Sequence, residues 1–376
     1  PWDLSACATS AASSSLVPFF EAAAGAALAL LASPELVAAA GAGFAASAAV
    51  AGDAEAAANE IVLWNWGGDA VKCHTSAFGA DFTKESGLPV KYDTSGPLQG
   101  KIKEMVNSGN VTADVADADA FDAISLGKSG HLEKIDYSVV DKKKVLEGFA
   151  WDYGVSIIFY GYAFMYDTKK FKSNPPSTWA DFFNTKKYPG KRSLYKWANG
   201  ALEGALMADG VSKDKVYPMD LDRAINKIKS IKSDTIFWGS GSEAQQMIVN
   251  GEVSMGMVWL NRAKAVEADT NGRYRLNMNE AIAMPGAYLV PKGNPAGRAN
   301  VMKFIASCQV AERQIEILRC HGMTPSNPEA FGMIPDDLKR FAVTSEENLS
   351  RVLLNDPIWW AENIGPALNK YLEAIG

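Results

Sequence analysis

From residue 60 onward, short apolar runs alternate with segments in which apolar residues recur every three or four positions. Apolar runs bounded by turn residues indicate buried strands, and the longer spacing indicates helices. The pattern predicts, in order, strand 61–64, helix 76–86, strand 88–92, helix 98–106 and strand 113–116. This alternation with short connections predicts an α/β protein with largely parallel sheets.

The second half of the chain repeats this alternation with longer strands. Two long apolar stretches, 155–166 and 282–290, would suit two crossings of a hinge between lobes. Further elements are expected at 179–183 (helix), 242–249 (helix), 253–259 (strand) and 300–319 (one continuous helix). In the helix 98–106, residues Leu98, Ile102, Met105 and Val106 are expected to share one apolar face.

Polar residues follow two of the predicted strands. Asn65-Trp66-Gly67-Gly68-Asp69 follows the first strand, and Asp117-Ala118-Asp119 follows the third. In parallel sheets, ligands bind at the carboxyl ends of the strands, so these strings predict the mouth of a site. The alternative is ordinary turn chemistry, because Gly-Gly-Asp and Asp-x-Asp are common in loops.

Charge limits the classes of partner. The formal net charge is −6, no Lys or Arg precedes Lys72, and the six excess acids all lie in residues 1–60. The remaining chain is neutral and lacks the net positive charge that phosphate binding needs, so a nucleic acid is not expected as a partner. The length of 376 residues and the hydrophobic share of 48% are enough for two ordinary domains.

The first 59 residues differ in composition from the rest. Residues 1–60 hold 24 alanines, and the uncharged run from Ala22 to Pro34 has the length of an export-signal core. That run is too short to span a bilayer as a helix. The segment lacks the positive charge of a signal start, so an Ala-rich spacer or helical arm stays an alternative. We therefore exclude residues 1–59 from the fold and expect an exported, periplasmic protein.

The cysteines show no metal or disulfide pattern. Cys7, Cys73, Cys308 and Cys320 contain no CxxC pair. In one continuous helix Cys308 and Cys320 would lie ~18 Å apart, whereas a disulfide needs Cα atoms within ~7 Å. We expect buried free thiols, which do not identify the compartment.

Catalytic patterns are largely missing from the sequence. His74, His131 and His321 form no HExxH pair, and each is expected in a loop or on the surface. A Walker motif and a GxSxG elbow are absent, and two S-x-x-K matches, at Ser125 and Ser193, are frequent by chance. We therefore expect no enzyme, no catalytic residue, no cofactor and no metal site. The rival classes are an enzyme on a two-lobe α/β scaffold and a structural or adhesive surface protein.

Tryptophans suggest a ligand site. Ten are present, and several stand where a strand meets a loop, namely Trp64, Trp66, Trp197, Trp238 and Trp259. An indole offers a large apolar face and one N–H donor, which suits a small organic ligand and above all a cation. We expect Trp64, Trp179 and Trp359 in packing, and Trp66, Trp197 and Trp259 facing solvent or ligand.

Five strings in the same order across some 300 residues give the sequence a family resemblance: 62–66, 165–171, 176–182, 251–259 and 321–327. Together they resemble the periplasmic solute-binding proteins of ABC transporters, in the branch similar to spermidine/putrescine-binding proteins. The resemblance implies a type II periplasmic-binding fold with two lobes, a hinge and an interlobe ligand cleft. It implies lobe 1 at 60–160 and 285–328, and lobe 2 at 161–284 and 329–376.

The resemblance also implies a set of ligand-binding positions. They are Trp66, Gly67, Asp69, Asp119, Tyr160, Lys196, Trp197, Trp259, Arg262 and Gly286. This sequence departs from the family at the acidic residues that bind the ligand's amines, because those positions hold Trp197, Gly200 and Gly286 here. Lys196 and Arg262 bring positive charge near the same place. A buried ammonium without a carboxylate partner is costly, so these departures weaken a polyamine assignment.

The sequence thus predicts the solute-binding component of an ABC importer. It would act as a monomer, capture a small polyamine-like or other nitrogenous solute between two lobes, and deliver it to the transmembrane permease subunits. We expect a ligand with at least one amine, held by Trp66, Trp259 and Asp119, and we expect Arg262 to bind an acidic group of the ligand. Glu362 beside Trp360 is a further candidate carboxylate for an amine. The alternative is the same fold with a carboxylate or zwitterionic solute.

Overall fold

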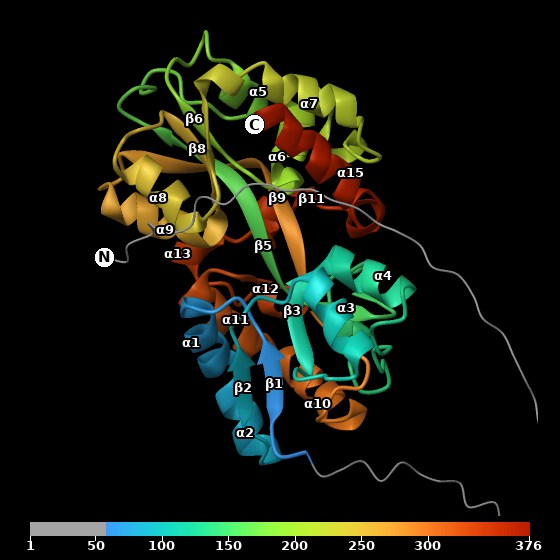
Figure 1. The fold of residues 1–376 in the computed structure, drawn as a ribbon. Coiled ribbons are helices and arrows are strands. Elements are labelled where there is room, and N and C mark those ends of the chain that lie inside the picture. Colours follow the sequence, from blue (N-terminus) through green and yellow to red (C-terminus); the bar gives the residue numbers. More distant parts are fainter. Residues whose placement is uncertain (1–57) are drawn as a thin grey trace, which may run out of the picture. The chain divides into compact units, whose positions relative to one another are not determined.

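The computed structural model describes residues 58–376, so the expected signal or spacer segment lies outside the described residues apart from its last two positions. The strands are β1 (Ile61–Trp64), β2 (Val90–Asp93), β3 (Val115–Asp119), β4 (Ala150–Trp151), β5 (Gly154–Asp167), β6 (Arg192–Tyr195), β7 (Thr235–Trp238), β8 (Met255–Trp259), β9 (Tyr274–Leu289), β10 (Thr324–Pro325) and β11 (Leu353–Leu354). Figure 1 shows how the helices surround them.

The helices of the first half match the predicted helices near 98–106 and 179–183, whereas the predicted helix 76–86 forms the end of a longer helical run that starts at Asp69. They are α1 (Asp69–His74), a π-helical turn (Thr75–Gly79), α2 (Ala80–Ser86), α3 (Gln99–Ser108), α4 (Ala120–Lys128), α5 (Trp179–Phe183), α6 (Ala198–Ala208) and α7 (Leu221–Lys229). Those of the second half are α8 (Gly241–Val249), α9 (Leu260–Asp269), α10 (Arg298–Cys308), α11 (Ala311–His321), α12 (Pro328–Phe331), α13 (Asp336–Lys339), α14 (Glu346–Leu349) and α15 (Pro357–Ile375).

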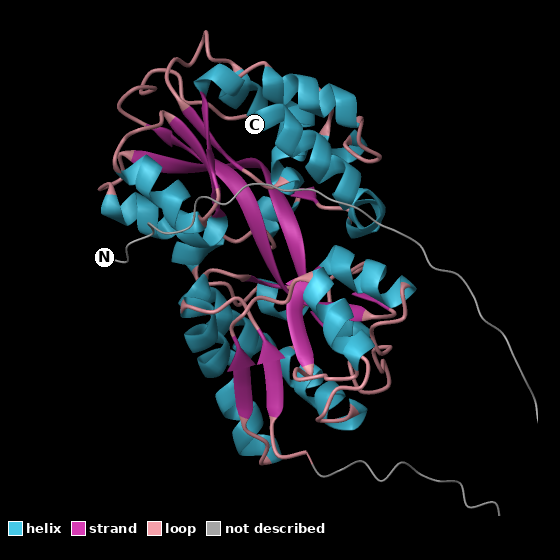
Figure 2. Ribbon diagram, in the orientation of Figure 1, coloured by secondary structure: helices cyan, strands magenta, loops and turns pink. Residues whose placement is uncertain are grey.

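The main strands join in the order β2-β1-β3-β9-β5-β8-β6-β7. Pairing is parallel at both ends of this path, in β2-β1-β3 and β8-β6-β7, and antiparallel in its middle. The long strands β5 and β9 run side by side and connect the two parallel ends, as Figures 1 and 2 show. The structure therefore has the predicted α/β class and the two predicted long strands.

Two main hydrophobic cores lie along these long strands. One gathers around Phe164, Trp179, Trp238 and Trp360, and the other around Phe78, Phe159, Tyr288 and Phe304. β5 supplies Phe164 to the first core and Phe159 to the second, which is why almost its whole length is apolar and buried. Trp64 and Trp179 are buried as predicted, whereas Trp359 is half-buried.

The expected helix 300–319 is two helices. α10 ends at Cys308 and α11 begins at Ala311; the distance argument concerned only Cys308 and Cys320, which are not bonded, and left Cys73 out of account. Cys320 in α11 is bonded to Cys73 in α1, with Cα atoms 5.4 Å apart and 247 residues between them in sequence. The prediction of free thiols is wrong for this pair and correct for buried Cys308, while Cys7 lies outside the described residues.

Two smaller predictions are also wrong. Leu98 is 51% exposed, because it precedes α3 in an extended conformation rather than joining the buried face of Ile102 and Met105. His74 is only 1% exposed, because α1 packs its last turn against α11 and the sheet.

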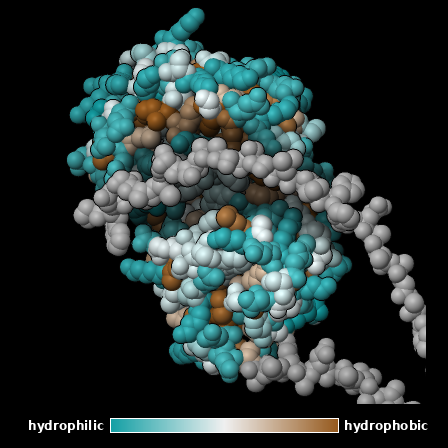
Figure 3. All heavy atoms as spheres, in the orientation of Figure 1, coloured by the Kyte–Doolittle hydropathy of each residue, from teal (hydrophilic) through white to brown (hydrophobic). Residues whose placement is uncertain are grey.

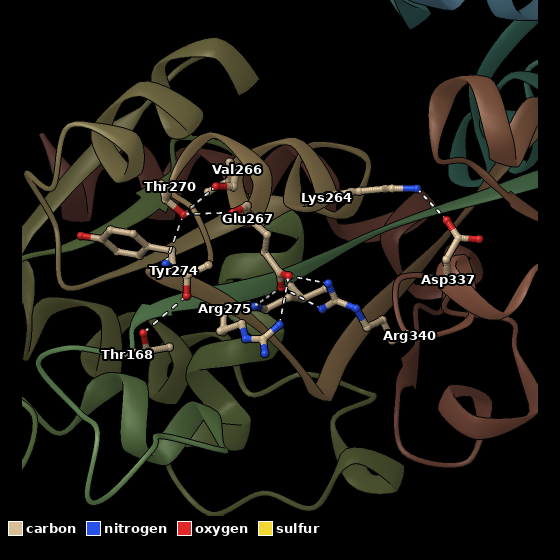
Figure 4. A network of polar contacts seen from close by, with 11 residues as sticks. Thr168, Lys264, Val266, Glu267, Thr270, Tyr274, Arg275, Asp337 and Arg340 are labelled. Carbon is tan, nitrogen blue, oxygen red and sulfur yellow. Dashed lines mark hydrogen bonds and ion pairs between the residues drawn. The ribbon is translucent and has the colours of Figure 1, made fainter.

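Ion pairs fix α9 against its neighbours, as Figure 4 shows. Glu267 of α9 accepts hydrogen bonds from Arg340 (2.9 Å to Nη1) and from the backbone N–H of Leu276 (3.0 Å). Lys264 of α9 contacts Asp337 of α13 at 2.9 Å. These contacts join α9 to β9 and α13, which matters because the first turn of α9 follows directly after Trp259.

The outer surface is mostly polar. On the face drawn in Figure 3, hydrophilic residues dominate the described part and apolar residues form small separate patches. Within residues 58–376, no helix is long and apolar enough to cross a membrane.

Candidate functional site

A loop after β1 presents Trp66 to solvent. The indole is 54% exposed, and its Nε1–H donates to the backbone oxygen of Asp117 at 2.8 Å. Gly67 and Gly68 have φ values of +79° and +60°, which other residues rarely adopt, so the two glycines allow the turn. A Cβ atom at Gly96 would lie 3.5 Å from the ring, so this backbone supports the indole from one side. The ring is thus fixed at one edge and remains accessible.

Asp119 lies at the end of β3 and precedes α4. Its Oδ1 accepts a 2.6 Å hydrogen bond from the hydroxyl group of Tyr160 in β5. Burial raises the pKa of Asp119 to about 6, and the Tyr160 hydrogen bond opposes that rise. Burial and the neighbouring charge of Asp119 raise the pKa of Asp117 to about 7. Carboxylates with such pKa values would gain from a nearby cation.

An aromatic cluster leads from Tyr160 toward β6, β7 and β8. Tyr160 and Tyr162 have ring centroids 5.9 Å apart, and Tyr162 lies 6.1 Å from Tyr195. Tyr195 stacks on Trp238 at 4.4 Å, and Trp259 meets both rings edge to face at 5.4 and 5.5 Å. A Cβ atom at Gly241 would lie 2.6 Å from the Trp259 ring, so glycine is required there. These rings form an apolar wall near Asp119.

Arg262 stands in the first turn of α9, three residues after Trp259. Its Nε is buried without a hydrogen-bond partner among the described residues, and Nη1 makes only a 3.5 Å contact with Gln245. Burial lowers the pKa of His321 in α11, Asp69 acts to raise it, and Arg262 acts to lower it. Asp69 and Arg262 thus both lie close enough to His321 for their charges to shift its pKa. The guanidinium group has donors left for an acidic group.

The other predicted positions lie around this region. Trp197 is 36% exposed and precedes α6, and the backbone N–H of exposed Lys196 donates to the oxygen of Trp238. Asp69 is exposed at the start of α1. Gly286 is buried in β9, where it pairs with both Asp119 and Ile158. Gly286 is therefore the direct pairing partner of Asp119 on the neighbouring strand.

Glu362 was a further candidate carboxylate beside Trp360, and the structure contradicts that placement. Its side chain is exposed and pairs with Lys128 at 2.7 Å, whereas Trp360 points into the core. Trp360 and Glu362 are two positions apart on α15 and therefore face different directions, which explains the error.

Sequence reasoning missed the members of the aromatic cluster that lie inside strands. Tyr162 and Tyr195 give no signal beyond strand propensity. Trp238 was noted for its place at a strand end, without a site role. Asn65 and Asp117 belonged to the strings at the predicted mouth, and they prove to be buried and bonded to each other at 3.1 Å.

A surface pocket lies away from this region. It measures about 480 Å³ and is lined by residues including Lys170, Tyr188 and Lys187, beyond the end of β5. Its lysines already bind Ser254 and Asp181, so they are not free for a ligand. Among residues 58–376, no group of three His, Cys, Asp or Glu side chains could hold a metal ion.

The sequence matches the family of bacterial extracellular solute-binding proteins over residues 77–340. The chain belongs to this family. It is 26% identical over 327 residues to the gamma-aminobutyric acid-binding protein of Pseudomonas aeruginosa, covering 84% of this chain and 90% of that protein.

Solved structures agree with this assignment. The structure of a receptor for gamma-aminobutyric acid (GABA) is 34% identical, with a TM-score of 0.78 over 85% of this chain and 98% of that one. An ABC transporter substrate-binding protein from Bradyrhizobium japonicum is 29% identical, with a TM-score of 0.79 over 85% and 100%. The binding protein AgtB of A. tumefaciens in complex with agropinic acid is 31% identical, with a TM-score of 0.72 over 84% and 98%.

These findings confirm the two-lobe type II periplasmic-binding fold and the predicted function. The family member is a solute-binding component of an ABC importer that captures a small organic solute and works with permease subunits. The relatives are named for binding or transport, and none of those cited is named for spermidine or putrescine.

Proposed function

We propose that the solute is a small ω-amino acid of the GABA type, with an ammonium group at one end and a carboxylate at the other. One observation carries the proposal. A carboxylate (Asp119) is bonded to Tyr160 at one end of the aromatic cluster, and a guanidinium group with an unpartnered donor (Arg262) follows Trp259 at its other end. The names of two relatives, both for GABA, support it.

The ammonium group would lie near Asp119 and the exposed face of Trp66. A cation over an indole gains about 0.5–2 kcal/mol, depending on how dry the site is. A carboxylate whose pKa burial has raised to about 6 gains further from a nearby positive charge. Tyr160 would hold Asp119 in place through its 2.6 Å hydrogen bond.

The carboxylate of the solute would bind Arg262. Its planar guanidinium group can hold a carboxylate in two parallel hydrogen bonds, which an ammonium group cannot reproduce. Lys196 and Trp197, which begin the segment leading into α6, would border the solute from the same lobe. Gly67 and Asp69 would border it from the other.

A polyamine would need carboxylates at both ends of the cleft. Gly200, where the resemblance places one acidic anchor, has φ +82°, and a Cβ atom there would lie 2.5 Å from Tyr162. An acidic side chain at position 200 would therefore require a different backbone. This steric limit supports an amino acid over spermidine or putrescine.

We also propose how the solute is enclosed. Residues 60–160 and 285–328 would form lobe 1, and 161–284 and 329–376 lobe 2, with β5 near Tyr160 and β9 near Gly286 as the hinge. Binding would bring the lobes together in the periplasm, and the protein would work as a monomer with its permease. X-ray scattering at saturating GABA should then show a smaller radius of gyration.

Two variants test the assignment of the charges. In calorimetric titrations with GABA, Asp119→Asn should weaken binding through the ammonium group, and Arg262→Lys should weaken it through the carboxylate. Each loss should be at least about tenfold, because Asp119→Asn removes the negative charge and Arg262→Lys removes the two parallel hydrogen bonds of the guanidinium group. Asp152→Asn, at an exposed surface ion pair, is the matched control and should bind like the wild type. Unchanged affinity in both site variants would contradict the proposal.

A further inference from the structure

We propose that Asp117 positions the solute-binding loop, defined as residues 65–69, without contacting the solute. This inference rests on the proposed function, because that proposal places Trp66 and Asp69 at the solute. The geometry on which it depends is independent of any ligand.

Asp117 holds the loop through two different groups. Its carboxylate Oδ2 accepts a 3.1 Å hydrogen bond from Asn65 Nδ2, and its backbone oxygen accepts the 2.8 Å bond from Trp66 Nε1. Asn65 in turn accepts a 3.1 Å bond from the backbone N–H of Gly67 at its Oδ1. Three consecutive loop residues therefore depend directly or indirectly on one aspartate.

Besides these contacts, the loop is held by a 2.7 Å hydrogen bond from the backbone N–H of Asn65 to the oxygen of Asp93 and by the Gly96 backbone beside the Trp66 ring. Asn65 is fully buried, so loss of the Asp117 acceptor would leave a buried amide without a partner. Gly67 and Gly68 adopt positive φ values and impose little conformational restriction of their own. Loss of the Asn65 contact should therefore loosen the turn that presents Trp66.

The rear of Asp117 is fixed by the sheet and by α1. Asp117 pairs with Tyr288 across β3 and β9, and the Tyr288 hydroxyl lies 3.0 Å from His74 Nδ1. His74 Nε2 lies 3.8 Å from Asp117 Oδ2. The neighbouring Cys73 is bonded to Cys320, which fastens α1 to α11. Asp117 thus connects a rigid support to the loop.

Burial distinguishes the role of Asp117 from that of Trp66. Asp117 is 6% exposed and its carboxylate faces Asn65 and His74, whereas Trp66 is 54% exposed. Asp117 is therefore a positioning residue, and Trp66 is the residue it presents.

Hydrogen exchange of the ligand-free protein tests the inference without any solute. In Asp117→Ala, the backbone amides of residues 65–70 should exchange at least about tenfold faster, because local opening of the loop becomes easier. Asp117→Asn keeps an acceptor for Asn65 and should stay within about threefold of the wild type. Asp152→Ala, at an exposed surface ion pair, is the control and should leave these amides unchanged.

Asn65→Ala removes the same hydrogen bond from the other side, together with the bond that Asn65 accepts from the Gly67 N–H. It should reproduce the faster exchange, and it tests the inference even if Asp117→Ala fails to fold. Unchanged exchange at residues 65–70 in Asn65→Ala, or in a folded Asp117→Ala, would overturn the inference.

A double-mutant cycle on GABA affinity supplies the functional test. Asp117→Ala and Asn65→Ala should each weaken binding, and the double variant should be little worse than Asn65→Ala alone, because both single variants remove the Asn65–Asp117 contact. Additive losses would refute the positioning role. If the wild type does not bind GABA while the exchange results hold, the proposed solute is wrong and the loop inference stands.

Discussion

The hydroxyl group of Tyr160 donates a 2.6 Å hydrogen bond to Asp119 Oδ1, which joins the long strand β5 to the carboxyl end of β3. Tyr160 is also the first ring of the aromatic cluster that reaches Trp259. The contact therefore links an acidic group at the end of β3 to the aromatic cluster beside β6, β7 and β8. It places Asp119 where an ammonium group could approach both.

The pH dependence of binding follows from Asp119. Because its pKa is raised to about 6, the carboxylate takes up a proton as pH falls through that value and no longer attracts an ammonium group. GABA affinity should thus be nearly constant from pH 8 to 7 and fall from pH 6 to 5. Calorimetry at each pH measures this, and Asp119→Asn should flatten the profile. Tighter binding at pH 5 would contradict the role of Asp119.

The same carboxylate should cost stability in the ligand-free protein. Its folded pKa of about 6 exceeds the unfolded value, so between those values the folded state binds more protons than the unfolded state. The destabilising contribution is therefore full above pH 6 and lost as pH falls toward 4. Asp119→Asn should melt at a higher temperature than the wild type at pH 8, with the difference shrinking by pH 4.5. An equal difference at both pH values would argue against a raised pKa.

Two tryptophans should separate binding from stability. Trp66→Ala should weaken GABA binding by about 2 kcal/mol with little change in melting temperature, because the ring is exposed and, in the proposed site, would contact the solute. Trp179→Ala empties a fully buried site and should cost about 3–5 kcal/mol of unfolding free energy. Calorimetry and thermal melts measure the two effects. Normal binding by Trp66→Ala would move the site elsewhere.

The Cys73–Cys320 bond should stabilise the lobe that carries Trp66. Replacing both residues by serine should lower the unfolding free energy by about 2–4 kcal/mol, as loss of a native disulfide commonly does. Cys308 is buried, so Cys308→Ser would itself change the stability of the protein and is not a suitable control. The wild type under reducing conditions is the control. A non-reducing peptide map should contain the linked pair. Recovery of free Cys73 alone would refute the bond.

Local patterns predicted much of this fold. The apolar runs identified β1, β5, β8 and the second half of β9, because buried strands need apolar residues on both faces. Helix α5 has the predicted bounds, since Thr178 caps its first turn by accepting from the Asp181 N–H. The sequence also pointed to the loop after β1, where Trp66 proves to be exposed.

Tertiary contacts explain what the sequence could not supply. The Cys73–Cys320 bond spans 247 residues and depends on the packing of α1 against α11. The break between α10 and α11 carries no Gly or Pro, so no local signal marks it. Glu362 and Trp360 differ in direction by helix geometry, which composition does not reveal.

The central claim is that the solute carries both charges, and a series of four-carbon compounds tests it most directly. Calorimetric titration should compare GABA with putrescine, which has two amines, and with n-butylamine and butyrate, which each keep one group. The account predicts that GABA binds at least about 100-fold more tightly than any of the other three, because each of them loses one charge-assisted contact. Putrescine binding as tightly as GABA, or more tightly, would contradict it.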